Sequence, residues 1–500
     1  MEITMSILSS FFATALASYD QLLIIAYLVV FLGLAVYGFH RSQLVYLYYR
    51  YRDQRPEPLG QIRDLPKVTV QLPLFNEMYV AQRLLDAVAK IRYPRDRFEI
   101  QVLDDSTDET QELCKSKVAE IAAQGIQISY VHRVDRTGFK AGALENGLKT
   151  AKGEFLLVFD ADFIPEPDVL ERTIHFFSDP KVAMVQVRWD HLNRDYSALT
   201  EVQALMLDGH FVIEHTARHR SGRFFNFNGT GGIWRRQAIS DAGGWQHDTL
   251  TEDMDLSYRA QLKGWRFVYL PDVVSPAELP VEMNSFKSQQ FRWAKGSIQV
   301  AKKLLPTILR SNASFSVKTE AFFHLTNNFA YPLLLLLSLL LLPNLLVRTT
   351  HGLREVLLID MPLFFGTTLS VAAFYITSQR EIDRGGWMRT IKRLPLMMSL
   401  GIGLCINQTR AVLEALMQHD SGEFVRTPKH GVVAKIEAWR TKKYRADKTL
   451  IPALEVGFAA YFALAIALAM KNGHWMSLPF LLLFFLGYAY VGVLSLVQTR

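Results

Sequence analysis

Apolar residues are concentrated in long segments near the two ends of the chain, and a polar region, residues 41–310, separates them. Five apolar segments reach or approach the length of about 20 residues that an α-helix needs to cross a bilayer. They are residues 22–39, 322–347, 356–376, 451–470 and 477–497. The pattern therefore predicts a multi-pass membrane protein whose one large polar domain lies between the first and second spans.

A further apolar stretch, residues 394–417, is long enough to cross but carries Asn407, Gln408, Arg410 and Glu414. A charge at the bilayer centre costs about 2.5 to 3.5 kcal/mol on insertion scales. Basic segments flank the stretch on both sides, and such segments favour the cytoplasm. We therefore expect a helix that lies at the inner membrane surface or lines a protein cavity, with five spans in all. The alternative is six spans with one basic loop outside.

The first 20 residues lack a basic start and carry Glu2. This composition favours a surface-lying amphipathic helix before the first span over a cleaved signal peptide.

Within the polar region, short apolar runs alternate with helical patterns. Strands are expected at residues 68–72, 98–103, 126–131 and 155–159, and helices at 76–90 and 108–123. Such alternation predicts an α/β domain with a parallel sheet and helices on both faces. Ligands of these sheets bind beyond the carboxyl ends of the strands.

Polar clusters follow three of the predicted strands: Phe75-Asn76-Glu77, Asp104-Asp105-Ser106 and Asp160-Ala161-Asp162. Converging carboxylates repel one another, so an aspartate-rich site normally holds a cation. Hard oxygen ligands suit Mg²⁺ or Mn²⁺, which complete their coordination shell with water and substrate phosphates. Asp160 and Asp162 are the predicted metal ligands, although Asp-x-Asp also occurs in solvated loops.

Three later segments carry candidate chemistry. Lys140 in "TGFKAGAL" can meet a diphosphate, and a carboxylate of "TEDMDL" (251–256) can act as a general base. In "QQFRW" (289–293), Arg292 can bind phosphate and Trp293 can stack on a sugar ring. Each segment also has an ordinary interpretation. Lys140 is then a surface lysine, Thr251 caps a helix, and residues 289–293 belong to an amphipathic helix.

The net charge of +7 does not indicate nucleic-acid binding, because the basic residues gather beside the apolar segments, as the positive-inside rule describes. No basic stripe with interleaved aromatic residues is present. The two cysteines are too few for a disulfide framework or a zinc site.

The motifs D, D-x-D, TED and Q-x-x-R-W occur here in that order, across residues 104 to 293. In this respect the chain resembles the membrane-embedded, inverting family 2 glycosyltransferases, the group of cellulose synthase and its relatives. Further segments, among them "FKAGAL", "FNGTGGIWRR" and "KGWRFVYL", look most like the cellulose synthase-like mannan and xyloglucan-backbone synthases. The strong similarity covers about residues 63–301.

The resemblance implies a cytosolic GT-A (Rossmann-like) α/β catalytic domain inserted between transmembrane helices, with Mg²⁺ or Mn²⁺ bound. It implies that Asp253 deprotonates the acceptor with support from Glu252, and that Asp160 and Asp162 hold the metal. The implied donor-binding residues are Phe75, Glu77, Asp104, Asp105, Lys140, Asp160, Gln289, Arg292, Phe424, Thr427 and Lys429. The implied acceptor-binding residues are Phe227, Asn228, Gly229, Thr230 and Trp293.

The segment "EFVRTPKHG" (423–431) is similar to the gating loop of cellulose synthases, with Phe424, Thr427 and Lys429 at matching positions and Arg426 where that family has valine. Phe163 stands where cellulose synthases usually carry histidine, which makes cellulose itself a less favoured product.

The favoured function is a processive synthase that extends a β-linked hexose polysaccharide and passes it across the membrane. UDP-glucose is the favoured donor, with GDP-mannose close behind. The partners are then a nucleotide sugar, the growing polysaccharide and membrane lipids, in a bacterial inner membrane or, for a plant protein, the Golgi. The alternatives are transfer of one sugar to a lipid, as in ceramide glucosyltransferases, and a non-catalytic scaffold.

These predictions divide the chain into five parts: residues 1–40 (N-terminal segment and first span), 41–320 (catalytic domain), 321–378 (two spans), 379–449 (interfacial helix and gating-like loop) and 450–500 (two spans).

Overall fold

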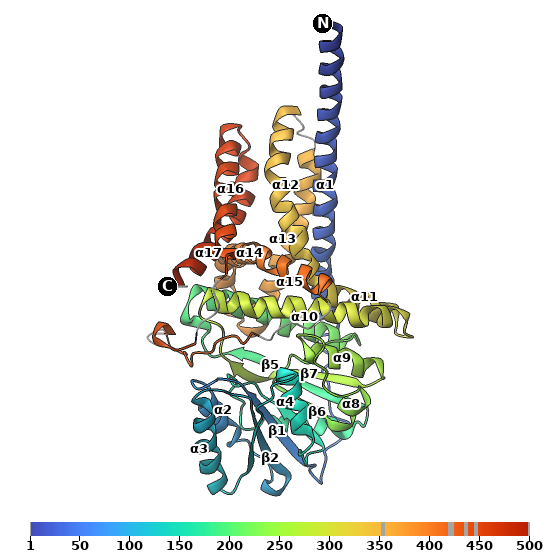
Figure 1. Ribbon diagram of the computed structural model, residues 1–500. Helices are drawn as coiled ribbons and strands as arrows, with labels where there is room; N and C mark the ends of the chain where they lie inside the picture. Colours follow the sequence, from blue (N-terminus) through green and yellow to red (C-terminus); the bar gives the residue numbers. More distant parts are fainter. Residues whose placement is uncertain (1, 352–355, 419–424, 435–438, 445–448, 499–500) are drawn as a thin grey trace.

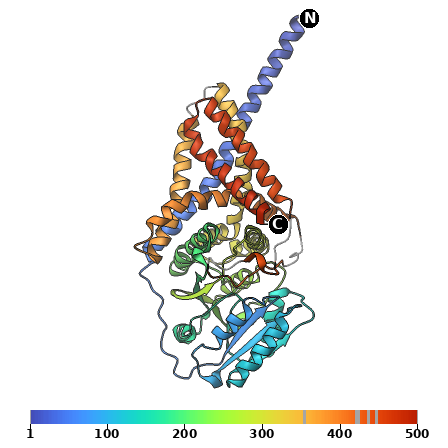
Figure 2. The same cartoon turned by 90° about the vertical axis from the view of Figure 1, so that its left-hand side faces the viewer.

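The computed structural model describes residues 2–351, 356–418, 425–434, 439–444 and 449–498. An α/β layer and a layer of long helices lie one above the other, and two views at right angles show the same division (Figures 1 and 2). The helix α10 (Met283–Arg310) lies between the two layers.

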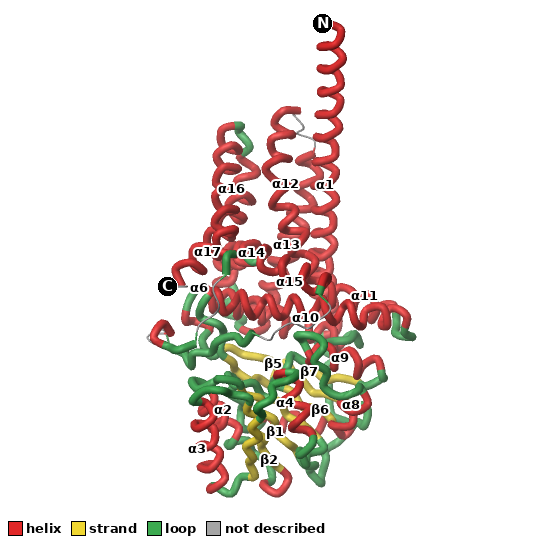
Figure 3. Tube along the Cα trace, viewed as in Figure 1, coloured by secondary structure: helices red, strands yellow, loops and turns green. Residues whose placement is uncertain are grey.

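A mixed sheet of seven strands forms the centre of the α/β layer (Figure 3). The strand order is β3-β2-β1-β4-β6-β5-β7. The strands are β1 (Val68–Leu74), β2 (Phe98–Asp104), β3 (Gln127–His132), β4 (Phe155–Val158), β5 (Val182–His191), β6 (Gly232–Arg235) and β7 (Arg266–Ala277).

The four strands expected from the apolar runs are confirmed as β1 to β4, and they pair in parallel. Val68 of β1 stands opposite both Phe98 of β2 and Phe155 of β4. The sequence did not predict the other three strands, of which β6 runs antiparallel to both of its neighbours. The sheet is therefore mixed and not wholly parallel.

Both faces of the sheet are buried, because the apolar side chains of β1 and β4 pack into separate cores on the two sides. One core holds Val68 and Leu157, the other Leu156 and Val158. The helices of this layer are α2 (Ala81–Val88), α3 (Thr110–Ala123), α4 (Phe139–Leu148), α5 (Val169–Thr173), α6 (Ala198–Asp208), α7 (Thr216–Arg220), α8 (Arg236–Asp241) and α9 (Glu252–Leu262). The predicted helices at 76–90 and 108–123 correspond to α2 and α3.

Length and hydropathy single out four stretches of the described residues as able to cross a membrane: Tyr19–Tyr51, Phe315–Val347, Ile451–Lys471 and Trp475–Gln498. These stretches correspond to part of α1 (Glu2–Tyr51), to α11 (Phe315–Thr326) with most of α12 (Ala330–His351), to α16 (Ile451–Lys471) and to α17 (Leu478–Gln498). The other predicted span forms the helix α13 (Val356–Ile382), which packs beside α1.

The stretch expected at the membrane surface forms two helices, α14 (Met388–Gly403) and α15 (Cys405–Met417), bent by 42° at Leu404. Together they have the length and composition of one further span. In both views they lie across the ends of the long helices and beside α10 (Figures 1 and 2). Their position at the membrane surface stays a prediction.

The N-terminal segment differs from the expectation of a separate surface-lying helix. Residues 2–51 form one continuous helix along a single axis (Figure 1). The reason lies in the sequence: no proline or glycine interrupts residues 2–32, so nothing ends the helix before the first span.

Candidate active site

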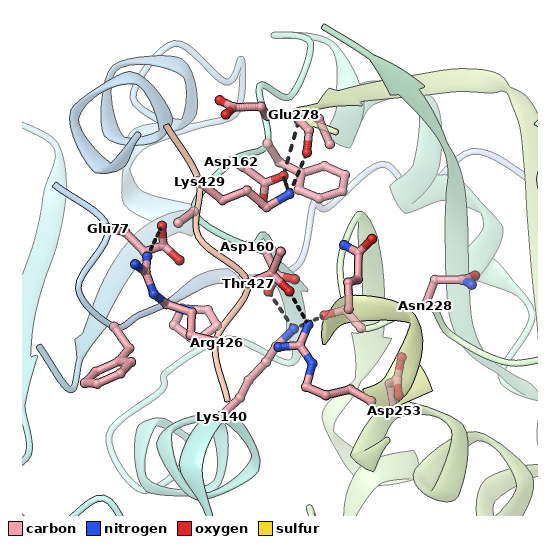
Figure 4. A pocket seen from close by; sticks show the side chains of 18 of the residues that line it. Glu77, Lys140, Asp160, Asp162, Asn228, Asp253, Glu278, Arg426, Thr427 and Lys429 are labelled. Carbon is pink, nitrogen blue, oxygen red and sulfur yellow. Dashed lines mark hydrogen bonds and ion pairs between the residues drawn. The ribbon is translucent and has the colours of Figure 1, made fainter. Parts of the chain in front are cut away.

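A cavity of about 210 Å³ lies beyond the carboxyl ends of β1, β2 and β4, beside α10 (Figure 4). It gathers most of the residues predicted from the motifs. The predicted residues in its lining are Phe75, Glu77, Asp105, Lys140, Asp160, Asp162, Asn228, Gly229, Glu252, Asp253, Gln289, Arg292, Trp293, Thr427 and Lys429.

Lys140 enters the cavity from the first turn of α4. The turn before it has positive φ at Gly138 (76°) and Phe139 (47°), a conformation that glycine adopts at little cost and that brings the chain round sharply. The Lys140 ammonium donates to Asp160 Oδ1 at 2.5 Å and to the carbonyl oxygen of Gly229 at 2.9 Å. It thus stands between the Asp-x-Asp turn and the loop after Phe227.

The Asp-x-Asp turn follows β4 directly. The backbone N–H of Asp160 donates to Thr230 Oγ1 (2.8 Å), which fixes the start of the turn. Asp162 Oδ2 accepts from the Lys429 ammonium (2.7 Å) and from the N–H of Glu278 (3.2 Å). Burial raises the pKa of Asp160, and the charge of Lys140 partly offsets that rise.

The two carboxylates fit a divalent cation that shares its ligands with a substrate. Among the described residues, no group of three histidine, cysteine, aspartate or glutamate side chains is placed to hold a metal ion. Mg²⁺ is bound through one or two carboxylates and takes its other ligands from water and phosphates. Asp160 and Asp162 match that requirement in number and type, so a nucleoside diphosphate would have to supply further ligands.

Glu252 and Asp253 begin α9. Asp253 Oδ1 accepts the N–H of Met254 (2.8 Å), and Oδ2 lies against Gly229, where a Cβ atom would come within 3.1 Å of it. Burial, and then the negative charge of Glu252, raise the pKa of Asp253 to about 7. A carboxylate with this pKa can accept a proton near neutral pH, as a general base must.

Gln289, Arg292 and Trp293 line the cavity from α10. Arg292 donates to the carbonyl oxygen of Val425 (2.8 Å) and to Thr427 Oγ1 (3.0 Å), and burial lowers its pKa to about 10. One turn further along, Gly296 lies so close to Thr251 that a Cβ atom there would be 2.4 Å from Thr251 Cγ2. The close contact fixes α10 against the TED segment.

A second cavity, of about 250 Å³, meets the first at Asn228, Asp253, Gln289 and Trp293. Its other end is lined by Arg41 of α1, Tyr331 of α12, Tyr375 of α13 and Gln408 of α15. Polar side chains therefore lead from the candidate base towards the membrane helices.

Two histidines hold Asn228 at the junction of the cavities. Its side-chain amide contacts His210 Nε2 (2.9 Å) through Nδ2 and His215 Nε2 through Oδ1. His210 Nδ1 in turn lies 2.9 Å from Glu214 Oε2. With both sides of the amide engaged, the orientation of the Asn228 side chain is fixed.

Four predicted site residues do not appear in the lining. Asp104 is fully buried and accepts from the Tyr130 hydroxyl (2.6 Å) and the N–H of Ser106 (2.9 Å), so it supports the loop from behind. Phe227 packs in the core against Trp234, and Thr230 is buried behind Asp160. Phe424 lies outside the described residues.

The motifs did not point to four charged residues that line the cavity: Arg136, Asp190, Glu278 and Arg426. Arg136 lies over the Phe75 ring, 3.4 Å from its centroid. Arg426 forms an ion pair with Glu77 (2.9 Å), whose pKa burial nevertheless raises to about 8. Figure 4 shows this pair beside the Asp162–Lys429 pair. The basic residues before "TGFKAGAL" are a signal for Arg136, but the sequence offers none for Glu278.

Comparisons with known proteins identify the family of the chain. A family model described as "Glycosyltransferase like family 2" matches residues 66–296. The chain is 43% identical over 280 residues to glucomannan 4-beta-mannosyltransferase 2 of Arabidopsis thaliana, which is 54% of this chain and 52% of that protein. It is 33% identical over 469 residues to the probable glucomannan 4-beta-mannosyltransferase 9 of Oryza sativa subsp. japonica, with 88% of this chain and 84% of that protein covered.

Among solved structures, the mannosyltransferase PcManGT from Pyrobaculum calidifontis, in complex with GDP-Man and Mn²⁺, superposes with a TM-score of 0.51 at 21% sequence identity. The match covers 72% of this chain and 97% of that one, and it supports the GT-A fold. The chain spans about half the length of the Arabidopsis relative and most of the length of the rice one. On the family match and the extended similarity to the rice protein, the chain belongs to the cellulose synthase-like group of family 2 glycosyltransferases.

Proposed function

We propose that the chain is an inverting, processive hexosyltransferase that builds a β-linked polysaccharide from GDP-mannose and passes the product into the membrane. The observation that carries the proposal is the meeting of the two cavities at Asp253. One cavity holds the Asp-x-Asp carboxylates and Lys140, and the other leads to the membrane helices.

Asp253 is the proposed general base. A sugar hydroxyl is a poor nucleophile near neutral pH, so it needs an acceptor for its proton as it attacks the anomeric carbon. The new C–O bond forms on the face opposite the bond to the diphosphate, and the configuration inverts in this single displacement. Trp293 stacks on the terminal sugar of the acceptor, and Asn228 orients it.

The departing diphosphate carries the developing negative charge. Lys140 and Arg292 line the donor cavity as preformed cations, and such groups stabilise charge in a water-poor site more strongly than water does. A divalent cation held by Asp160 and Asp162 would supply further charge neutralisation when bound.

We propose GDP-mannose as the donor in place of UDP-glucose, because the names of the two relatives point to mannosyl transfer. Both of the relatives described above are named as glucomannan 4-beta-mannosyltransferases. The sequence left the two donors open, and no cavity residue selects between them on chemistry alone.

We also propose that the α/β layer lies on the cytosolic side of the membrane, where nucleotide sugars are present. The second cavity then receives the lengthening chain. Its lining of tyrosine, glutamine and arginine side chains offers hydrogen-bond partners to sugar hydroxyls.

The test is nucleotide release from a panel of nucleotide sugars by the full chain purified in detergent, with separation of the products. We expect GDP release from GDP-mannose and a ladder of β-linked oligosaccharides or an insoluble glycan. Asp253→Asn should lower the rate by about 10²- to 10⁴-fold, the usual contribution of a general base. Asp241→Asn, on the exposed end of α8, is the matched control and should leave the rate unchanged.

UDP release from UDP-glucose alone would overturn the donor. A single glycolipid product would favour transfer to a lipid, and full activity of the Asp253→Asn variant would overturn the assignment of the base.

A further inference from the structure

The segment 425–430 crosses the donor cavity and is tied to it by side chains from three directions (Figure 4). Arg292 of α10 binds Val425 and Thr427, Glu77 after β1 pairs with Arg426, and Asp162 after β4 pairs with Lys429. We call residues 425–430 the strap. Arg426 and Lys429 of the strap therefore form ion pairs with carboxylates that a donor and its metal ion would use.

Lys429 makes the most specific of these contacts. Its ammonium lies 2.7 Å from Asp162 Oδ2 and 2.5 Å from the carbonyl oxygen of Glu278, and the side chains of Lys429 and Asp162 are 10% and 9% exposed. Glu278 is itself fixed, because its carboxylate accepts the N–H of His430 (2.9 Å) and pairs with Arg83 (3.3 Å). The ammonium group of Lys429 therefore lies between two oxygen atoms whose positions are fixed by the surrounding contacts.

Each carboxylate of the Asp-x-Asp turn has its own lysine. Lys140 is paired with Asp160, and Lys429 with Asp162. Two negative and two positive charges sum to zero at the turn, so a divalent cation alone meets no excess of negative charge there. A cation bound to Asp162 would also lie close to the ammonium group of Lys429, and the repulsion between these like charges weakens its binding.

We propose that Lys429 makes metal binding conditional on the nucleotide: it holds Asp162 until a nucleoside diphosphate arrives, then passes to the phosphates and leaves Asp162 to the metal ion. The diphosphate supplies both the negative charge that draws the cation in and a new partner for the ammonium. The inference depends on the proposed function only in taking a nucleoside diphosphate as the ligand of this cavity. It gives Lys429 a second role besides donor binding, the control of metal binding.

The test measures Mn²⁺ binding directly, with no sugar donor or acceptor present. The full chain in detergent is titrated with Mn²⁺, and the free ion is followed by its electron paramagnetic resonance signal, with and without GDP. Without GDP the wild-type chain should bind Mn²⁺ at least about tenfold more weakly than Lys429→Met, and GDP should remove most of that difference. Lys429→Arg, which keeps the charge, should behave like the wild type.

Two controls keep the result specific. Lys443→Met removes another lysine that follows the strap, one that pairs with exposed Glu109 (2.8 Å) outside the cavity, and it should leave Mn²⁺ binding unchanged. Lys429→Met combined with Asp162→Asn should lose the gained affinity, because the ion then lacks its carboxylate. Thermal unfolding of each variant shows whether it is folded.

Equal Mn²⁺ affinity of the wild type and Lys429→Met without GDP would overturn the proposal. So would a gain that persists in the double variant, since the ion would then bind elsewhere. Neither result depends on which polymer the enzyme makes. A chain that releases no GDP from GDP-mannose can still show the nucleotide-dependent Mn²⁺ site, so the two proposals fail separately.

Discussion

The contact between Gly296 and Thr251 provides a direct test of how closely α10 and the TED segment must be held together. A Cβ atom at position 296 would lie 2.4 Å from Thr251 Cγ2, 2.7 Å from Oγ1 and 2.9 Å from the backbone nitrogen. Rotation of the Thr251 side chain can relieve the first two contacts but not the third. Gly296→Ala must therefore move one backbone segment away from the other.

The size of the movement follows from these distances. Ordinary contacts begin at about 3.4 Å, and the Cβ atom would lie 2.9 Å from the backbone nitrogen of Thr251, so α10 and that backbone must separate by about 0.5 Å. Asp253 lies two residues after Thr251, and Arg292 and Trp293 lie on α10, so the proposed base moves relative to the groups that bind phosphate and acceptor. A misplacement of about 1 Å can cost about 10²-fold in rate, so half that distance can cost about tenfold. We expect such a loss in kcat, with a smaller change in the KM for the donor.

The assay is nucleotide release as a function of donor concentration, with thermal unfolding in detergent as the check on folding. Gly401→Ala is the matched control, because a Cβ atom at that position in α14 has no neighbour within 4 Å. Adding Thr251→Ala to Gly296→Ala removes two of the three close contacts and should restore part of the rate. A folded Gly296→Ala variant with kcat within twofold of the wild type would refute the reasoning.

Two further predictions concern buried charges. The profile of kcat/KM against pH should rise to half its plateau at about pH 7, as Asp253 loses its proton. Glu252→Gln should move that midpoint to lower pH, because it removes the neighbouring negative charge that raises the pKa of Asp253. A midpoint that moves to higher pH would contradict this electrostatic account. Glu455→Gln should destabilise the protein by about 3 to 5 kcal/mol, seen as a lower thermal unfolding temperature, because it leaves the ammonium of Lys287 (4% exposed) buried without its carboxylate. The double variant Lys287→Met/Glu455→Leu should recover most of that loss, and an unchanged unfolding temperature in Glu455→Gln would show that the pair contributes little.

The first half of the sheet could be predicted because its strands are continuous apolar runs bounded by polar turns, as at 155–159. In the second half, β5 also begins with an apolar run, but β6 and β7 lack that signal. Pro271 and Pro276 interrupt the apolar pattern of β7, and β6 has only four residues. The antiparallel direction of β6 depends on pairing with β4 and β5, which are distant in sequence, so no local pattern reveals it.

The motifs located the site but not the direction of every side chain in it. Asp104 and Asp105 are adjacent, yet one is buried against Tyr130 while the other lines the cavity, because successive side chains at a strand end point to opposite sides. In the loop before β6, Phe227 likewise lies in the core while Asn228 lines the cavity. The pairs Glu77–Arg426 and Asp162–Lys429 join residues far apart in the chain, and only the fold brings them together.

The position of the Q-x-x-R-W motif on α10 has a physical rationale in the contacts of that helix. Lys287 pairs with Glu455 of the membrane helix α16, Arg292 binds the strap, and Gly296 packs on Thr251. Lys287 and Gly296 are nine residues apart, about two and a half turns, so they lie on opposite faces of α10. One face is therefore fixed to the membrane layer and the other to the catalytic residues. Because one helix holds both layers, we expect a shift of α16 to displace the proposed base and the strap together.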